Sequence, residues 1–261
     1  VQACGQSETQ NTEVGSEQLT LESIYKDKTF SGERGTYFRW LKDGSGYTVL
    51  EEREGVSEDS EQTSDEEHGI SGNDIVFYNP DATGRNVLVE FEKLIPKGAE
   101  EPLSIEDYQW SEDGKWLMVF TNGKKVWRSR SRGDFWVLNL ETSALYQLGG
   151  ESPEPSKLMF AKFSPDSTRV AYVKDNNIYT EKVGDQTITA LTTDGDENTV
   201  NGNFDWVYEE EFSIRDGFRW SPDSKNIAYW QLDTSGVKYF TMINNTKSLY
   251  PELTEFPYPK A

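Results

Sequence analysis

The stretch WSPDSKNIAY at residues 220–229 decides the fold, because closely related phrases occur three more times along the chain. They are FSPDSTRVAY at residues 163–172, WSEDGKWL at residues 110–117 and, in a looser form, WLKDGSGY at residues 40–47. In each phrase an aromatic residue is followed by a Pro-Asp or Asp-Gly turn, after which apolar residues resume. The phrase therefore predicts the end of one strand, a tight turn and the start of the next strand.

The spacing of these phrases indicates the architecture. Their first aromatic residues lie 70, 53 and 57 positions apart, and the longest interval contains an acidic insertion at residues 51–67. A repeat of roughly 40 to 55 residues with paired strands is typical of four-stranded propeller blades, whereas helical solenoids repeat faster. We therefore predict an all-β fold, a partial β-propeller of about four four-stranded blades.

Strand signals outnumber helix signals in the rest of the chain. Runs bounded by turn residues predict further strands at residues 74–79, 135–140, 177–183 and 238–243. Short helices are predicted only at residues 19–25 and 206–212, and the second is a helical insertion in the propeller. Because no ring-closing strand is visible, we expect an open arc cut from a larger propeller. A ring of four blades that closes on itself is the alternative.

The formal charge of −20 excludes several classes of partner. Binding of nucleic acid or of an anionic membrane needs a basic surface, which this composition does not provide. Residues 1–22 hold four acids and no base, and residues 51–67 hold nine acids and one base. Such runs are typical of solvated loops or tails. We therefore assign residues 1–18 to a tether, and residues 19–261 to the partial propeller.

The single cysteine, Cys4, excludes an intrachain disulfide and a cysteine-based metal site, and the sequence predicts neither a metal nor a cofactor. Val1-Gln2-Ala3-Cys4-Gly5 resembles the end of a bacterial lipoprotein signal, and a polar, Gly- and Ser-containing stretch follows it. Cys4 is therefore a candidate lipidation site, which predicts location in the bacterial cell envelope or periplasm. The alternative is a free cysteine in a disordered tail.

The glutamate motif, DWVYEEEF at residues 205–212, is the densest cluster of unusual residues. Two carboxylates held side by side among aromatic side chains make a site for a primary ammonium, which donates three hydrogen bonds and carries the opposite charge. The free amino terminus of a peptide, with a pKa of about 8, is such a group. The alternative is an acidic run on the surface of a short helix.

The chain resembles the amino-terminal propeller of the dipeptidyl peptidase IV family. The resemblance is carried by residues 205–211 of the glutamate motif, by Trp220-Ser221-Pro222-Asp223 with Ile227-Ala228-Tyr229, and by the ending Phe-Pro-Tyr-Pro-Lys-Ala at residues 256–261. It covers the chain from about Leu19 to Ala261. The resemblance implies that Glu210 and Glu211 bind the ammonium of the substrate and that Glu209 is a less direct neighbour. The secondary members of this site are Asp205, Trp206 and Tyr208.

A second matched position is Arg128, within Lys125-Val126-Trp127-Arg128-Ser129. It resembles a family strand whose arginine contacts a substrate carbonyl oxygen. A guanidinium suits this contact because it is always charged and its N–H donors lie in one plane. The side chains of Glu210 and Glu211 can reach one ligand only if the backbone bends or the ligand lies between them, because adjacent helical residues point about 100° apart. Because other basic residues lie next to Arg128, Arg130 is an alternative candidate for this position. A second alternative is a basic hairpin without a role in binding.

The residues needed for peptide hydrolysis are missing from the sequence. No Gly-x-Ser-x-Gly elbow occurs, and the only histidine, His68, lies in an acidic stretch. The resemblance implies a catalytic α/β-hydrolase domain after Ala261, so the chain by itself is expected to be inactive.

The expected function is substrate recognition in a serine exopeptidase that releases N-terminal Xaa-Pro or Xaa-Ala dipeptides. Its expected partners are peptides with a free N-terminus and the hydrolase domain, and homodimerisation is left open. The alternatives are a non-catalytic propeller that binds or scaffolds a partner, and a relative whose hydrolase domain has lost its serine.

Overall fold

The computed structural model describes residues 20–27, 29, 38–54 and 70–258. The chain divides into two compact units, residues 1–37 and residues 38–261. The tether at residues 1–18 with Cys4, most of the acidic insertion, and His68 lie outside the described residues. In the first unit the structure describes one π-helical turn, η1 (Glu22–Lys26), where the sequence predicts a helix at residues 19–25.

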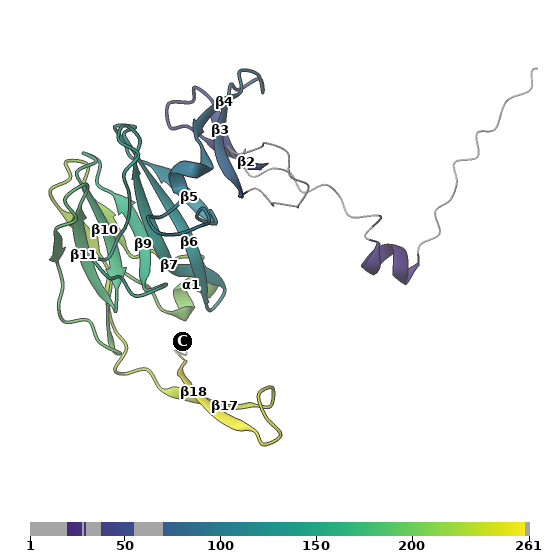
Figure 1. The fold of residues 1–261 in the computed structure, drawn as a ribbon. Coiled ribbons are helices and arrows are strands. Elements are labelled where there is room, and N and C mark those ends of the chain that lie inside the picture. The colour runs from purple at the N-terminus through teal and green to yellow at the C-terminus, as the bar shows by residue number, and fades with distance from the viewer. Residues whose placement is uncertain (1–19, 28, 30–37, 55–69, 259–261) are drawn as a thin grey trace, which may run out of the picture. The chain divides into compact units, whose positions relative to one another are not determined.

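The second unit is built from antiparallel sheets in which most neighbouring strands also follow one another in the chain, as Figure 1 shows for the central strands. The first sheet has the order β1-β2-β3-β4, formed by β1 (Phe38–Trp40), β2 (Tyr47–Glu54), β3 (Ser71–Tyr78) and β4 (Asn86–Val89). A short 3-10 helix that the sequence did not predict, η2 (Phe91–Leu94), follows β4. The first repeat is therefore a four-stranded blade.

The second and third repeats each supply four more strands. The second consists of β5 (Asp107–Trp110), β6 (Trp116–Val126), β7 (Ser129–Asn139) and β8 (Leu145–Gln147). The third consists of β9 (Leu158–Phe163), β10 (Arg169–Lys174), β11 (Asn177–Lys182) and β12 (Ile188–Ala190). These two blades are joined into one eight-stranded sheet where Gly133 of β7 pairs with Leu158 of β9. Only glycine fits there, because an added Cβ would lie 2.3 Å from the ring of Phe120.

The fourth repeat differs from the predicted four-stranded blade. Its strands form three separate pairs, β13 (Thr199–Asn201) with β16 (Gln231–Asp233), β14 (Phe218–Trp220) with β15 (Ile227–Tyr229), and β17 (Tyr239–Asn244) with β18 (Glu252–Pro257). The physical reason is the path of the chain after β15. At Trp230 it turns to hydrogen-bond with Gly202 and Gly217, which directs β16 onto β13 and leaves β17 to pair with β18 alone.

The four repeated phrases form the tight turns that their residues predict. In each, the fourth residue after the aromatic has a positive φ: Gly44 and Gly114 at 72° and 68°, and Ser167 and Ser224 at 60°. For the two serines this left-handed backbone is unfavourable in free energy, but their side chains connect neighbouring repeats. Ser167 Oγ accepts a hydrogen bond of 3.2 Å from the backbone N–H of Asp113, and Ser224 Oγ accepts one of 2.9 Å from that of Asp166.

The hydrophobic core lies between blades. Each of three clusters combines buried side chains of consecutive repeats: Ile75 packs with Leu117, Val137 with Val170, and Ile178 with Phe218. A buried polar contact also crosses the first interface, where Thr48 Oγ1 and the Tyr108 hydroxyl lie 2.7 Å apart. A blade is therefore stabilised mainly by its neighbours, which is the behaviour of a repeat architecture.

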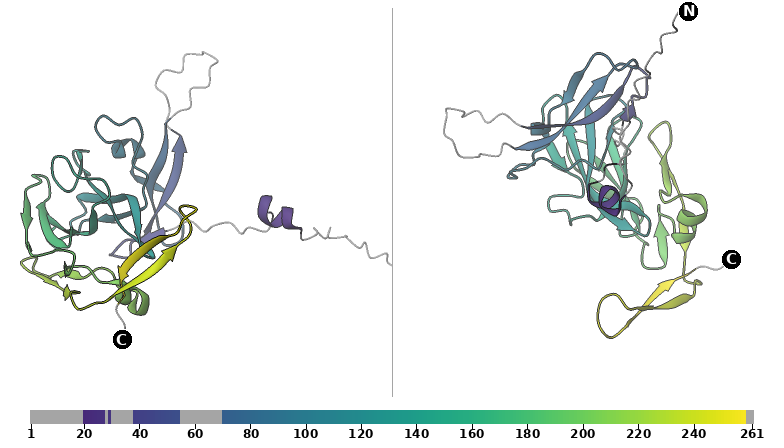
Figure 2. Two further views of the ribbon diagram at one scale, coloured as in Figure 1. Left: turned by 90° about the horizontal axis from the view of Figure 1, so that it is seen from below. Right: turned by 90° about the vertical axis from the view of Figure 1, so that its right-hand side faces the viewer.

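The hairpin β17–β18 packs little of its apolar surface against other elements. Most of its large apolar side chains are exposed, among them Ile243 at 64% and Leu253 at 72%. The hairpin, drawn in yellow, extends away from the sheets in Figure 1 and in the right-hand view of Figure 2. Across the part of the chain that the structure describes, no helix is long and apolar enough to cross a membrane.

Candidate functional site

The glutamate motif forms helix α1 (Trp206–Phe212), which confirms the helix predicted for these residues. Asp205 is its N-cap and accepts a 3.2 Å hydrogen bond from the backbone N–H of Tyr208. The helix ends at Ser213, which adopts a left-handed φ of 55°. Tyr208 stacks on Phe204 at 4.6 Å between ring centroids, so its ring packs within the fold. The capping and aromatic residues of the motif therefore hold the helix in place.

The hairpin between β6 and β7 carries the predicted arginine. Val126 pairs with Ser129, so Trp127 and Arg128 form a two-residue turn. Trp127 has a φ of 55°, which is uncommon for a bulky residue. Arg128 projects from the turn with its side chain 73% exposed. In Figure 1 helix α1 lies close to the end of these two strands.

The structure brings Arg128 and Glu210 together, although they lie 82 residues apart in the sequence. Arg128 Nε and Glu210 Oε1 form an ion pair, and the glutamate side chain is only 16% exposed. The alternative arginine, Arg130, instead lies 3.4 Å from the carboxylate of Glu106. Of these two arginines, Arg128 is therefore the one that contacts the glutamate motif, and its role toward a substrate stays a prediction.

The three glutamates of the motif have different surroundings. Glu209 is buried, and its Oε1 accepts hydrogen bonds from the backbone N–H of Ser129, at 3.0 Å, and from the Ser129 hydroxyl. Glu211 is exposed and has no hydrogen bond or ion pair among the described residues. The carboxylate of Glu211 is therefore free for a ligand, that of Glu210 is shared with Arg128, and that of Glu209 is already used within the protein.

Arg215 is a residue of this site that the sequence analysis missed. It is 7% exposed, and its Nη1 lies 3.6 Å from Glu209 Oε2. Its guanidinium carbon lies 4.1 Å from the centroid of the Trp127 ring. Burial lowers the pKa of Arg215, and the charges of Glu209 and Asp205 oppose this shift. No local pattern distinguishes this arginine from exposed Arg219, so the sequence carries no signal that would have identified it.

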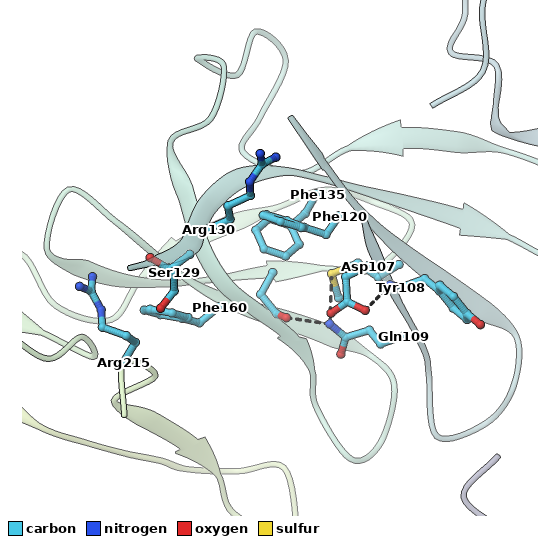
Figure 3. Close-up of a pocket in the computed structure, with 12 residues that line it drawn as sticks. Asp107, Tyr108, Gln109, Phe120, Ser129, Arg130, Phe135, Phe160 and Arg215 are labelled. Atoms are coloured by element: carbon cyan, nitrogen blue, oxygen red, sulfur yellow. Dashed lines mark hydrogen bonds between the residues drawn. The ribbon is translucent and has the colours of Figure 1, made fainter. Parts of the chain in front are cut away.

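A pocket of about 320 Å³ adjoins this group of residues (Figure 3). Figure 3 shows Ser129, Arg130 and Arg215 toward one end of the pocket, and Asp107 and Gln109 toward the other. Its apolar lining includes the rings of Phe120, Phe135 and Phe160. Because Ser129 and Arg215 also contact Glu209, the pocket lies beside the glutamate motif. Across the described residues no group of three or more His, Cys, Asp or Glu side chains is placed to hold a metal ion.

Comparisons with known proteins show which family the chain belongs to. Residues 111–261 match the family model for the dipeptidyl peptidase IV (DPP IV) N-terminal region. Dipeptidyl aminopeptidase B of Saccharomyces cerevisiae is 34% identical over 186 residues, which are 69% of this chain and 22% of the yeast protein. The crystal structure of Porphyromonas gingivalis dipeptidyl peptidase 4 matches with a TM-score of 0.73 and 29% identity, covering 95% of this chain and 32% of that one.

The chain thus spans about a fifth of the yeast protein and about a third of the bacterial one. The structural match confirms the predicted fold class, an all-β partial propeller. The chain belongs to the dipeptidyl peptidase IV family, whose N-terminal region it contains.

Proposed function

We propose that this chain is the substrate-recognition part of a serine exopeptidase that releases Xaa-Pro or Xaa-Ala dipeptides from the N-termini of peptides. The serine, aspartate and histidine of the reaction would lie on an α/β-hydrolase domain in the same protein. The observation that carries the proposal is the ion pair of Arg128 with Glu210, next to exposed Glu211 and beside a pocket.

The proposed contacts follow from charge and exposure. The substrate ammonium would lie between Glu210 and Glu211, because a primary ammonium has enough donors for both carboxylates. Arg128 is mostly exposed, so its guanidinium can turn to donate to the carbonyl oxygen of the first substrate residue.

Substitution of the two glutamates in the full-length protein tests the proposal. Glu210→Gln and Glu211→Gln keep the side-chain shape but remove the charge that attracts the ammonium. Each is expected to lower kcat/KM for a Gly-Pro chromogenic amide by a factor that corresponds to about 2 to 4 kcal/mol. Glu141→Gln, in the exposed turn after β7, is the matched control and should leave kcat/KM unchanged. Unchanged kcat/KM in both motif variants would refute the proposed ammonium site.

A further inference from the structure

We infer that Arg215 and Glu209 are positioning residues that fix the Trp127-Arg128 turn against helix α1 and so set the place of Arg128 relative to Glu210. The inference rests on the proposed function, because it concerns how the proposed substrate contacts are held. Neither residue would touch the substrate. Their effect would pass through Arg128.

The turn needs external support because its backbone is unfavourable. Trp127 has a φ of 55°, in the left-handed region that a bulky side chain adopts only at a cost in free energy. The residue at this position of a two-residue hairpin turn is usually Gly, Asn or Asp. A turn with tryptophan there keeps one conformation only where surrounding contacts hold it.

Contacts from helix α1 and the segment after it hold the residues on both sides of Arg128. On one side, the Arg215 guanidinium carbon lies 4.1 Å from the ring centroid of Trp127. On the other side, Glu209 Oε1 accepts hydrogen bonds from the backbone and the hydroxyl of Ser129. Arg128, between these two anchored neighbours, is the one residue of the three whose side chain extends to Glu210.

The anchoring groups are themselves buried and joined to each other. The side chains of Arg215 and Glu209 are 7% and 5% exposed, and their nearest charged atoms lie 3.6 Å apart. Arg215 Nε and Nη1 and Glu209 Oε2 have no hydrogen-bond partner among the described residues. A buried pair with so few hydrogen bonds contributes little net stability, because desolvation offsets the attraction between the charges. Stability alone therefore does not explain this pair, whereas holding the turn does.

Kinetics of the full-length protein test the inference, with Arg215→Gln as the main variant. We expect KM for a Gly-Pro chromogenic amide to rise about tenfold, while kcat stays within about twofold. The rate at which a fluorophosphonate labels the catalytic serine should not change, because that reagent does not use the ammonium site. The matched control is Arg219→Gln, which removes an exposed arginine four residues away and should alter none of these quantities.

Two further variants keep the test decisive. Since Arg215→Gln leaves Glu209 as an unpaired buried charge, the double variant Glu209→Gln/Arg215→Gln removes both charges and should fold while retaining the raised KM. In an Arg128→Gln background, Arg215→Gln should raise KM by less than about twofold, because the residue through which it acts is gone.

The outcomes separate this inference from the proposed function. If Glu210→Gln raises KM but the Arg215 variants with normal serine labelling do not, the positioning role is wrong and the ammonium site stands. A full tenfold effect of Arg215→Gln in the Arg128→Gln background would also overturn the inference. If neither Glu210→Gln nor Glu211→Gln changes kcat/KM, the proposed function fails first and this inference fails with it.

Discussion

At the scale of single residues, the site depends on side chains that neighbour one another in the sequence but have different surroundings. Glu209, Glu210 and Glu211 are respectively buried, mostly buried and exposed. Because helix α1 turns about 100° per residue, three successive carboxylates face three directions. One of them supports the β6–β7 turn, and the other two remain as candidates for the ligand.

The choice between the two arginines of the hairpin is directly testable. Arg128 pairs with Glu210, whereas Arg130 lies beside Glu106. We expect Arg128→Gln in the full-length protein to lower kcat/KM for a Gly-Pro amide by a factor equivalent to about 1.5 to 3 kcal/mol, the range for a hydrogen bond to a charged group. Arg130→Gln should change it by less than about twofold. The reverse result would favour Arg130 instead.

A second residue-scale prediction concerns Glu181, which is fully buried in β11. Its Oε2 accepts hydrogen bonds from the Gly149 N–H, at 2.9 Å, and the Tyr172 hydroxyl, at 3.1 Å, while Oε1 has no partner among the described residues. Burial raises the pKa of Glu181 above its ordinary value of 4.5. The folded state therefore binds this proton more tightly than the unfolded state does.

The sign of the pH dependence follows from that raised pKa. The ionised carboxylate reduces stability progressively as pH rises from about 4.5 through the folded-state pKa, and the full penalty applies above that pKa. Glu181→Gln should thus raise the midpoint of thermal unfolding at pH 8 by roughly 2–4 °C, the shift expected for about 1 kcal/mol. Near pH 4 the difference should largely disappear. A gain of the same size at both pH values would contradict this explanation, and Glu141→Gln serves as the exposed control.

At the scale of elements, the blades are connected through their turns as well as through the core. Ser224, in the turn between β14 and β15, accepts a hydrogen bond from the backbone of Asp166, in the turn between β9 and β10. Ser167 makes the equivalent contact with Asp113 one blade earlier. A serine at this position lacks the backbone freedom of glycine, but its hydroxyl accepts a hydrogen bond from the preceding repeat.

Substitutions of Ser224 separate these two effects. Ser224→Ala keeps the unfavourable φ of 60° and loses the hydrogen bond, so it should reduce the free energy of unfolding by about 1 to 2 kcal/mol. Ser224→Gly loses the same bond but relieves a backbone cost of about 1 to 2 kcal/mol, and should be nearly neutral. Urea unfolding curves of the two variants provide the comparison. Equal destabilisation by alanine and glycine would show that the left-handed backbone costs little here.

At the scale of the whole molecule, hairpin β17–β18 exposes most of its large apolar side chains. Ile243 and Leu253 lie directly opposite each other in the register of the hairpin, and both are mostly exposed. Contiguous exposed apolar residues of this kind are typical of interaction surfaces. We propose that the hairpin contacts a second copy of the protein.

The oligomeric state in solution tests this proposal. Ile243→Lys and Leu253→Lys place charges at the centre of the exposed surface and should convert a dimer to a monomer in light scattering coupled to gel filtration. Lys247→Glu, in the loop of the same hairpin, changes a charge without removing apolar area and should leave the mass unchanged. A wild-type protein that is monomeric at micromolar concentration would exclude the proposed dimer.

The sequence by itself determined the repeat, the four turns and helix α1. Each depends on residues only a few positions apart: Pro, Asp and Gly set local backbone angles, and Asp205 caps the helix three residues before the N–H that it binds. The resemblance to a family implied that Glu210, Glu211 and Arg128 contact the substrate, and these roles stay predictions.

The tertiary structure alone decided how these local elements meet. The pairing of Arg128 with Glu210 and the burial of Arg215 under Trp127 join segments about 80 residues apart, and no local pattern specifies such contacts. The division of the fourth repeat into strand pairs has the same origin, because β16 pairs with the distant β13. The hydrogen-bonding groups of turns and helix caps find partners within a few residues. Buried charges and strand edges find partners only in distant segments that the fold brings beside them.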